Sequence, residues 1–331
     1  MPKPFDFLTL YARYGREQQV SLNDPTTARA FLEDIRVQLD RALTDPIRVH
    51  GQRAQAMFEA LVVALGRFTL LKTEDRGRVH PPVGFRVPDF RVVLESGDQW
   101  LIEVKNVYEP DPFHQRRQLM KPGYLADLDA YAKATKATLK LAVFWARWGF
   151  WTLLSPHRLV DGDGYVKLEM FDAFRFNELS ELGDRFIGTT PPLMLRIVAD
   201  DTKPNLIGPD GNVQFTIGGG TLFCGGREVT RPAEQEIAWI LMNFGDWVEE
   251  TPRAVVENNR LRAIEFVWEP LEQNNEGFEM IGSLSRMFSR YYALETLSGR
   301  EVVQIEAEPR PGWLASLSAT DYKGMLSHFG A

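Results

Sequence analysis

Two apolar runs joined by a short polar segment decide how this chain folds: residues 87–94 are VPDFRVVL, and residues 100–108 are WLIEVKNVY. Both runs are rich in β-branched and aromatic residues, which is typical of strands. Between them, residues 95–98, ESGD, have the composition of a tight turn. The sequence therefore predicts a β-hairpin with one strand beginning at Asp89 and the second beginning at Trp100.

Three polar side chains interrupt this hairpin at one end. Side chains two positions apart on a strand share a face, so Glu103 and Lys105 point the same way and Val104 points to the other face. Antiparallel pairing brings Asp89 near both of them. Two carboxylates at one point repel each other unless a cation or a proton lies between them, and Mg²⁺ prefers oxygen ligands of this kind. A lysine beside them can position or deprotonate a water molecule, or offset the charge of a phosphorane, so the trio predicts metal-assisted phosphodiester hydrolysis.

The sequence around the hairpin predicts further helices and strands. Apolar residues at helical spacing predict helices over residues 26–44, 52–65 and 124–136. Short runs of strand-forming residues predict strands over residues 67–72, 139–146 and 150–154. The resulting order is typical of an α/β fold with a mixed sheet flanked by helices.

Pro88-Asp89, followed by Glu103-Val104-Lys105 at the end of an apolar strand, resembles the PD-(D/E)xK nuclease superfamily, the fold of restriction endonucleases and Holliday-junction resolvases. The resemblance covers residues 48–158. It implies a restriction-endonuclease-like core in which Asp89, Glu103 and the backbone carbonyl of Val104 bind Mg²⁺ or Mn²⁺, with Lys105 as the catalytic lysine. It also implies that Glu59, on the preceding helix, is a further catalytic and metal-binding residue. The alternative interpretation is a structural ladder of ion pairs on a strand face.

Polar residues that follow the hairpin are weaker candidates. Many members of the superfamily carry a Gln or Tyr motif on the next helix, and the residues considered for it are Gln118, Lys121, Tyr124 and Tyr131. We expect all four to lie on a helix surface. Arg116, Arg117 and Lys121 are expected to contact nucleic-acid phosphates, with an ordinary solvated loop as the alternative.

The charge is distributed unevenly along the chain, whose formal net charge is −7. Residues 1–160 hold 23 of the 38 Lys and Arg residues but only 18 of the 45 Asp and Glu residues. The half that contains the candidate site is therefore basic and suits a polyanion, DNA rather than RNA, although a balance of this size is also ordinary for a soluble domain.

Other function classes find no support. No apolar run is long enough to span a membrane, and Met1–Leu10 lacks the pattern of a secretory signal. The single cysteine, Cys224, excludes an intrachain disulfide and fits a reducing cytoplasm, and the five histidines lack metal-ligand spacing. Gly218-Gly219-Gly220 lacks the lysine of a P-loop and Asp161-Gly162-Asp163-Gly164 lacks the rest of an EF-hand loop, so each predicts a turn.

The pattern predicts three parts: an N-terminal helical segment at residues 1–46, the nuclease core at 47–160 and an acidic α+β domain at 161–331. In the third part we expect helices over residues 171–182, 232–244 and 278–297, and strands over 193–198, 213–217, 221–224, 262–268 and 302–307. Its expected role is regulation, homodimerisation or the binding of a partner protein.

The leading hypothesis is a Mg²⁺- or Mn²⁺-dependent endonuclease that acts on DNA, in a bacterial phage-defence or mobile-element system by analogy with the superfamily. A second hypothesis is a nucleic-acid-binding or partner-binding subunit that keeps the nuclease fold without turnover. A third is a structural subunit that acts through its C-terminal domain. Replacing Asp89 with alanine separates the first hypothesis from the second.

Overall fold

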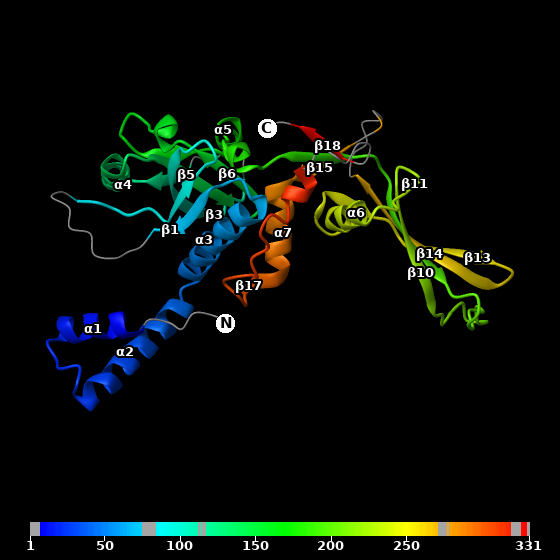
Figure 1. Ribbon diagram of the computed structural model, residues 1–331, viewed down its shortest axis with the longest axis horizontal. Coiled ribbons are helices and arrows are strands. Elements are labelled where there is room, and N and C mark those ends of the chain that lie inside the picture. The colour runs from blue at the N-terminus through cyan, green and yellow to red at the C-terminus, as the bar shows by residue number, and fades with distance from the viewer. Residues whose placement is uncertain are drawn as a thin grey trace. The chain divides into compact units, whose positions relative to one another are not determined.

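The computed structural model describes residues 7–74, 84–111, 113, 117–270, 277, 279–318 and 326–329. The chain divides into two compact units, Met1–Arg53 and Ala54–Ala331. Within the described part of the chain, the α-helices are α1 Phe7–Gln18, α2 Pro25–Leu43, α3 Pro46–Leu65, α4 Pro122–Thr135, α5 Met170–Arg175, α6 Pro232–Phe244 and α7 Leu284–Thr296 (Figure 1). None of the described helices combines the length and the apolar character that crossing a membrane requires.

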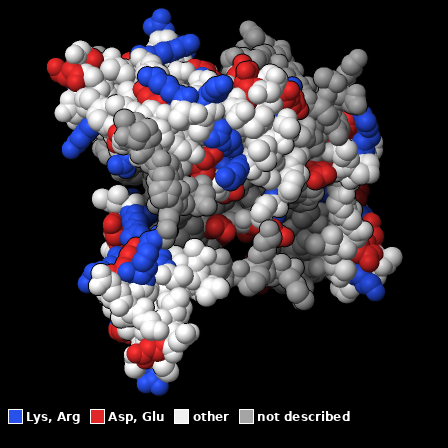
Figure 2. Space-filling view, turned by 60° about the vertical axis from the view of Figure 1, so that its left-hand side comes forward, with Lys and Arg blue, Asp and Glu red and all other residues white. Residues whose placement is uncertain are grey.

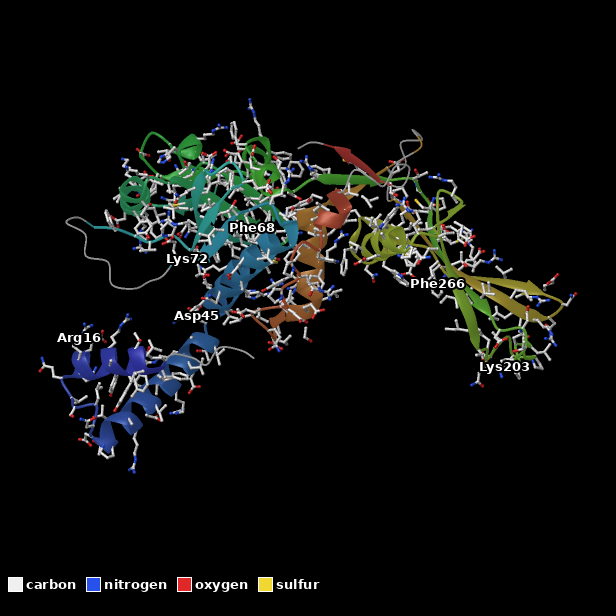
Figure 3. The ribbon with its side chains drawn as sticks, viewed as in Figure 1. Arg16, Asp45, Phe68, Lys72, Lys203 and Phe266 are labelled. Atoms are coloured by element: carbon white, nitrogen blue, oxygen red, sulfur yellow. The ribbon has the colours of Figure 1, made fainter. Side chains whose placement is uncertain are left out.

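The first unit is helical, and it contains a helix that the sequence did not predict, α1. The rings of Tyr11 and Tyr14 on α1 pack against Phe31 of α2. Asp24 caps α2, because its Oδ1 accepts a hydrogen bond of 2.8 Å from the Thr26 amide. The residues labelled Arg16 and Asp45 in Figure 3 lie near the end of α1 and just after α2.

Pro46 begins α3, in the gap between the helices predicted over residues 26–44 and 52–65. The side chain of Asp45 accepts hydrogen bonds from the amides of Ile47 and Arg48, and proline is favoured at the first position of a helix. The helix therefore starts earlier than the predicted residue 52. It ends where predicted, at Gly66, whose φ of 74° is a left-handed conformation that glycine adopts without strain.

A five-stranded mixed sheet forms the centre of the second unit, in the order β1-β2-β3-β5-β6. Its strands are β1 Leu70–Thr73, β2 Phe90–Val93, β3 Gln99–Val107, β5 Thr138–Trp145 and β6 Phe150–Leu154. The predicted hairpin is confirmed, since β2 and β3 pair in antiparallel fashion with Phe90 opposite Ile102. β3 and β5 are parallel, and α4 connects them. The predicted loop before α4 contains a short strand, β4 Arg117–Met120, which pairs with β7 Val166–Leu168.

Helices cover both faces of this sheet, and the alternation of side chains along β3 separates the two layers. Ile102 belongs to a hydrophobic cluster with residues of α3, α6 and α7. Leu101 belongs to a second cluster with residues of α4 and α5. Because side chains alternate between faces, Glu103 and Lys105 point toward the layer of α4. A charged pair thus interrupts an otherwise apolar face of β3.

Strands dominate the remainder of the second unit. One sheet contains β9 Leu193–Ala199, β10 Ile217–Cys224, β11 Arg227–Glu228, β12 Trp247–Glu249, β13 Arg253–Glu257 and β14 Arg260–Pro270. A smaller sheet contains β8 Phe186–Thr189, β15 Glu279–Ser283 and β18 Leu326–Phe329, and β16 Leu297–Ser298 pairs with β17 Glu301–Val302. Short 3₁₀ helices are η1 Pro156–Leu159, η2 Leu179–Leu182 and η3 Ala315–Ser318. In Figure 3, Phe266 marks β14 and Lys203 marks the segment after β9.

Several predictions for this region are wrong. The strands expected over residues 213–217 and 302–307 are absent except at Ile217, where β10 begins, and at Val302, where β17 ends. The glycine run Gly218–Gly220 is not a hairpin turn, because it lies inside β10 and pairs with β9 across a register shift between Ile217 and Gly219. The expected helix over residues 278–297 is a helix only from Leu284, since β15 precedes it. Ser283 caps α7 by accepting a hydrogen bond from the Arg286 amide, which fixes where the helix begins.

The fold class is confirmed: a mixed α/β structure with a mixed sheet flanked by helices, followed by a further region rich in strands. The division of the chain at residues 46 and 160 stays a prediction. One hydrophobic cluster includes Phe58 of α3, Trp151 of β6 and Phe288 of α7, so residues on both sides of position 160 share a core.

Candidate active site

Asp89 lies immediately before β2, where it meets both α3 and β3. Its Oδ1 accepts a hydrogen bond of 2.7 Å from Nε2 of Gln55, and its Oδ2 accepts one of 2.8 Å from the backbone amide of Val104. β2 begins one residue later, so no strand residue pairs with this amide, and the carboxylate takes that place. The side chain of Asp89 is therefore held in one orientation at the end of the hairpin.

Glu103 and Lys105 form an ion pair on the adjacent strand. Lys105 Nζ donates to Glu103 Oε1 at 2.5 Å, and the hydroxyl of Tyr124, on α4, donates to the same oxygen. Glu103 is buried, at 4% exposure, whereas 25% of the Lys105 side chain is accessible to solvent. The glutamate is thus fixed by two donors, and the lysine remains within reach of a bound molecule.

The electrostatics of this group favour a charged lysine and a neutral tyrosine. Burial alone would lower the pKa of Lys105, but the negative charge of Glu103 and the hydrogen bonds to Glu103 and Tyr124 outweigh it, so the pKa of Lys105 is raised. Burial and the charge of Glu103 raise the pKa of Tyr124. At neutral pH Lys105 is therefore a cation and hydrogen-bond donor, and not a free base.

A second charged network lies on the same face of the sheet, between β1, β2 and α4. Glu74, which is buried, accepts hydrogen bonds of 2.6 Å from Arg91 Nε and from the Tyr131 hydroxyl. The hydrogen bonds from Tyr131 and Arg91, together with the positive charge of Arg91, outweigh the effect of burial, so the pKa of Glu74 is lowered. Two tyrosines of α4 thus anchor the helix to two carboxylates of the sheet. The prediction that Tyr124 and Tyr131 lie on a helix surface is wrong.

Glu59 contacts β1, and its place in the site stays a prediction. Its Oε1 is 3.5 Å from the Thr73 hydroxyl, and burial together with the charge of Glu306 raises its pKa. The residue of α3 that contacts Asp89 is Gln55, one helical turn earlier. Sequence reasoning missed Gln55 because it sought an acidic residue, and an amide on a helix carries no sequence signal of such a contact.

The structure describes only some of the predicted phosphate-binding residues. Lys121 is exposed at the start of α4, and Gln118 is exposed on β4. Arg117 belongs to β4 by its backbone, and Arg116 lies outside the described residues. The guanidinium of Arg86, which the sequence analysis did not select, lies 4.2 Å from the centre of the Tyr124 ring. Arg86 therefore adds a second cation beside the lysine site.

The oxygen donors of Asp89, Glu103 and Val104 suit a hard divalent cation that takes few of its ligands from the protein. The Val104 amide points to Asp89, and on a strand the carbonyl of a residue points to the same side as its amide. Asp89 thus lies against the backbone of Val104, and Glu103 is the residue before Val104 on the same strand. Among the described residues, no group of three or more His, Cys, Asp or Glu side chains could hold a metal ion. Mg²⁺ is commonly bound by one or two carboxylates and keeps several water molecules, so this donor set suits it.

Comparisons with known proteins give a partial structural similarity. No family model matches the chain, and no curated protein matches it. Among solved structures, the chain is similar to Hjc, a Holliday junction resolvase from the archaeal hyperthermophile Archaeoglobus fulgidus. The two share 19% sequence identity, and the match covers 40% of this chain and 98% of that chain with a TM-score of 0.32.

Proposed function

We propose that this protein is a metal-dependent endonuclease that hydrolyses phosphodiester bonds, with DNA as its substrate. The observation that carries the proposal is the corner where Asp89 and Glu103 lie on paired strands with Lys105 beside them. Lys105 is held charged by a buried carboxylate and is still accessible to solvent. A ladder of ion pairs that serves only stability needs no second carboxylate at this point, since one lysine and one glutamate already neutralise each other.

Mg²⁺ or Mn²⁺ would be held by Asp89, by Glu103 through Oε2, the oxygen that neither Lys105 nor Tyr124 contacts, and by the carbonyl of Val104. When bound, the metal ion would polarise the phosphoryl group and acidify a water molecule. The protein contributes the rest. Lys105 presents a positive charge to the phosphate oxygens as negative charge develops on them, while Tyr124 keeps Glu103 in place.

Gln55 and the Val104 amide hold the Asp89 carboxylate in one orientation. A carboxylate that is already oriented loses little conformational freedom when it binds a cation. Arg116, Arg117 and Lys121 follow the catalytic strand in sequence and would contact the nucleic-acid backbone. Lys and Arg are interspersed with Asp and Glu among the coloured residues of Figure 2, so the contact would be local. A role in cytoplasmic defence against phage, or in a mobile element, is part of the proposal by analogy alone.

Cleavage assays test this proposal. The purified chain is incubated with supercoiled plasmid, single-stranded DNA or RNA, each with Mg²⁺, Mn²⁺ or EDTA. We expect cleavage of DNA with either metal ion and none with EDTA. Asp89→Asn and Glu103→Gln should each reduce the rate by about 10³-fold or more, the scale of losing a principal electrostatic contact. Glu95→Gln, in the exposed hairpin turn, is the matched control and should cleave normally.

The second candidate is a subunit that binds nucleic acid without turnover. The hydrogen bonds that engage both oxygens of Asp89 favour it, because they would also be expected of a purely structural carboxylate. That function would leave nucleic-acid binding intact in Asp89→Ala. Absence of cleavage with every substrate, together with no heat of Mg²⁺ or Mn²⁺ binding in calorimetry, would contradict the nuclease proposal and support this one.

A further inference from the structure

The first unit buries very little of its own surface. In α1 and α2 the buried residues are Gly15, Thr27 and Phe31. Pairs of short helices that bury so few apolar groups have little stability by themselves, because packing of an amphipathic face supplies most helical stability. Such a hairpin is therefore expected to pack against something else.

Helix α2 presents an exposed apolar stripe. Leu32, Leu39 and Leu43 are 63%, 55% and 61% exposed. At 3.6 residues per turn these three positions fall on one side of the helix, and the partly buried Ile35 borders them. Leu8 and Leu10 of α1 are also exposed, at 71% and 48%. Contiguous apolar surface of this kind on a soluble protein marks an interaction site.

We propose that α2 is a homodimerisation surface, which binds α2 of a second copy of this chain in antiparallel orientation. The apolar positions of the stripe, Leu32, Ile35, Leu39 and Leu43, have nearly the same spacing when the helix is followed in either direction. With the two-fold axis between Val37 and Gln38, Leu32 of one copy lies level with Leu43 of the other. Leu39 then lies level with Arg36 and one residue away from Ile35, so each leucine has an apolar residue within one position across the pair.

The stripe supplies most of the apolar area that a dimer of standard size requires. The three leucines offer roughly 100 Å² each, so the stripe presents roughly 300 Å² of apolar area before Ile35 is counted. A standard interface buries about 800 Å² on each partner, a little over half of it apolar. The polar side chains that flank the stripe would contribute the remainder.

Charge selects the antiparallel arrangement. Arg36 and Asp40 border the stripe and pair with each other along the helix at 2.9 Å. In an antiparallel pair, Arg36 of one copy lies near Asp40 of the other. In a parallel pair, like charges would lie side by side. This surface differs from the expected dimerisation through residues 161–331, and it does not depend on the proposed nuclease activity.

Sedimentation equilibrium of the full chain tests the proposal. We expect a dimer with a dissociation constant of about 1–10 µM, a range common for interfaces of this size. Leu39→Glu should weaken the dimer by about 100-fold, because it places charge in the apolar seam. Leu294→Glu, at a leucine of α7 that is 73% exposed, is the matched control and should leave the dimer intact. Circular dichroism verifies that each variant keeps its helices.

A charge exchange provides the second test, without altering the leucines. Arg36→Asp alone should weaken the dimer by about 5- to 10-fold, since two acidic groups then meet across the axis. Adding Asp40→Arg should restore it. A wild-type chain that remains monomeric at 100 µM, about tenfold above the expected dissociation constant, would overturn the proposal. A dimer that persists in Leu39→Glu would also overturn it, as would a dimer that Leu294→Glu disrupts. The same conclusion would follow if the double variant Arg36→Asp, Asp40→Arg dimerised no more tightly than Arg36→Asp alone.

Discussion

Glu103 on β3 and Asp184 at the start of α7 are both buried carboxylates, at 4% and 6% exposure, yet their surroundings differ in kind. Glu103 is paired with a charged lysine that solvent can reach. Asp184 accepts hydrogen bonds of 2.8 and 2.6 Å from the amide and hydroxyl of Ser285, and its other hydrogen-bond donor is the backbone amide of Arg185. Burial therefore does not separate a functional acid from a structural one, and the charge and accessibility of the partners do.

The two environments affect ionisation in opposite ways: one favours a neutral carboxyl group, and the other favours a charged amine. Burial raises the pKa of Asp184 to about 6, because neutral donors offset only part of the cost of removing a charge from water. At the other cluster, the carboxylate of Glu103 raises the pKa of Lys105 and thereby preserves a charge. Asp184 accepts a hydrogen bond from the Ser285 amide in the first turn of α7, where Ser283 is the N-cap, and the Glu103 group combines a buried carboxylate with an accessible cation.

The largest effect is expected at Lys105. Lys105→Met should reduce single-turnover DNA cleavage by about 10²- to 10⁴-fold, since the site loses its cation and Glu103 loses its counter-charge. Lys105→Arg keeps the charge but not the shape of the amine, and should retain part of the activity. Lys133→Met, at an exposed lysine of α4, is the control. If folded Lys105→Met kept full activity, that result would contradict a functional difference between the Glu103 cluster and the Asp184 cluster.

The geometry of the Glu103 cluster was predictable in part because it is local. The alternation of side chains along a strand places Glu103 and Lys105 on one face, and the turn at residues 95–98 returns Asp89 to them. The partners that complete the site come from elsewhere in the chain. Gln55 and Tyr124 lie 34 and 21 residues away from the carboxylates that they contact, and a single sequence carries no signal for such contacts.

The Asp184 cluster was not predictable, because its two residues are even farther apart in the sequence. Asp184 and Ser285 are 101 residues apart, and the end of α7 that they form was expected to lie inside a longer helix. Local propensity also misled at Gly218–Gly220, where pairing with β9 holds glycines in an extended strand that they do not favour by themselves. Tertiary pairing outweighed propensity at both places.

Asp184 should make a large contribution to the pH dependence of stability. Its folded pKa of about 6 exceeds the ordinary value of 3.8, so the folded protein binds the proton more tightly and is destabilised as pH rises from about 4 to 6. The expected loss of unfolding free energy over that window is about 3 kcal/mol. Asp184→Asn, which cannot ionise, should abolish this loss in urea titrations. Ser285→Ala removes a donor to the ionised form and should move the loss to higher pH, whereas an unchanged pH profile in Asp184→Asn would show that the acid is already satisfied when charged.

The smallest effects should separate Gln55 from Glu59, the two polar residues of α3 nearest in sequence to the site. Gln55→Ala removes one hydrogen bond to a charged group, and should lower the cleavage rate by about tenfold and weaken Mg²⁺ binding by a similar factor. Glu59→Gln should change neither by more than about twofold, because its carboxylate contacts Thr73 and not Asp89. Cleavage rates across a Mg²⁺ titration measure both quantities in one experiment. If Glu59→Gln lost as much activity as Asp89→Asn while Gln55→Ala lost none, the acidic residue that the superfamily resemblance implies would belong to the site after all, and the carboxylates that matter would extend onto α3.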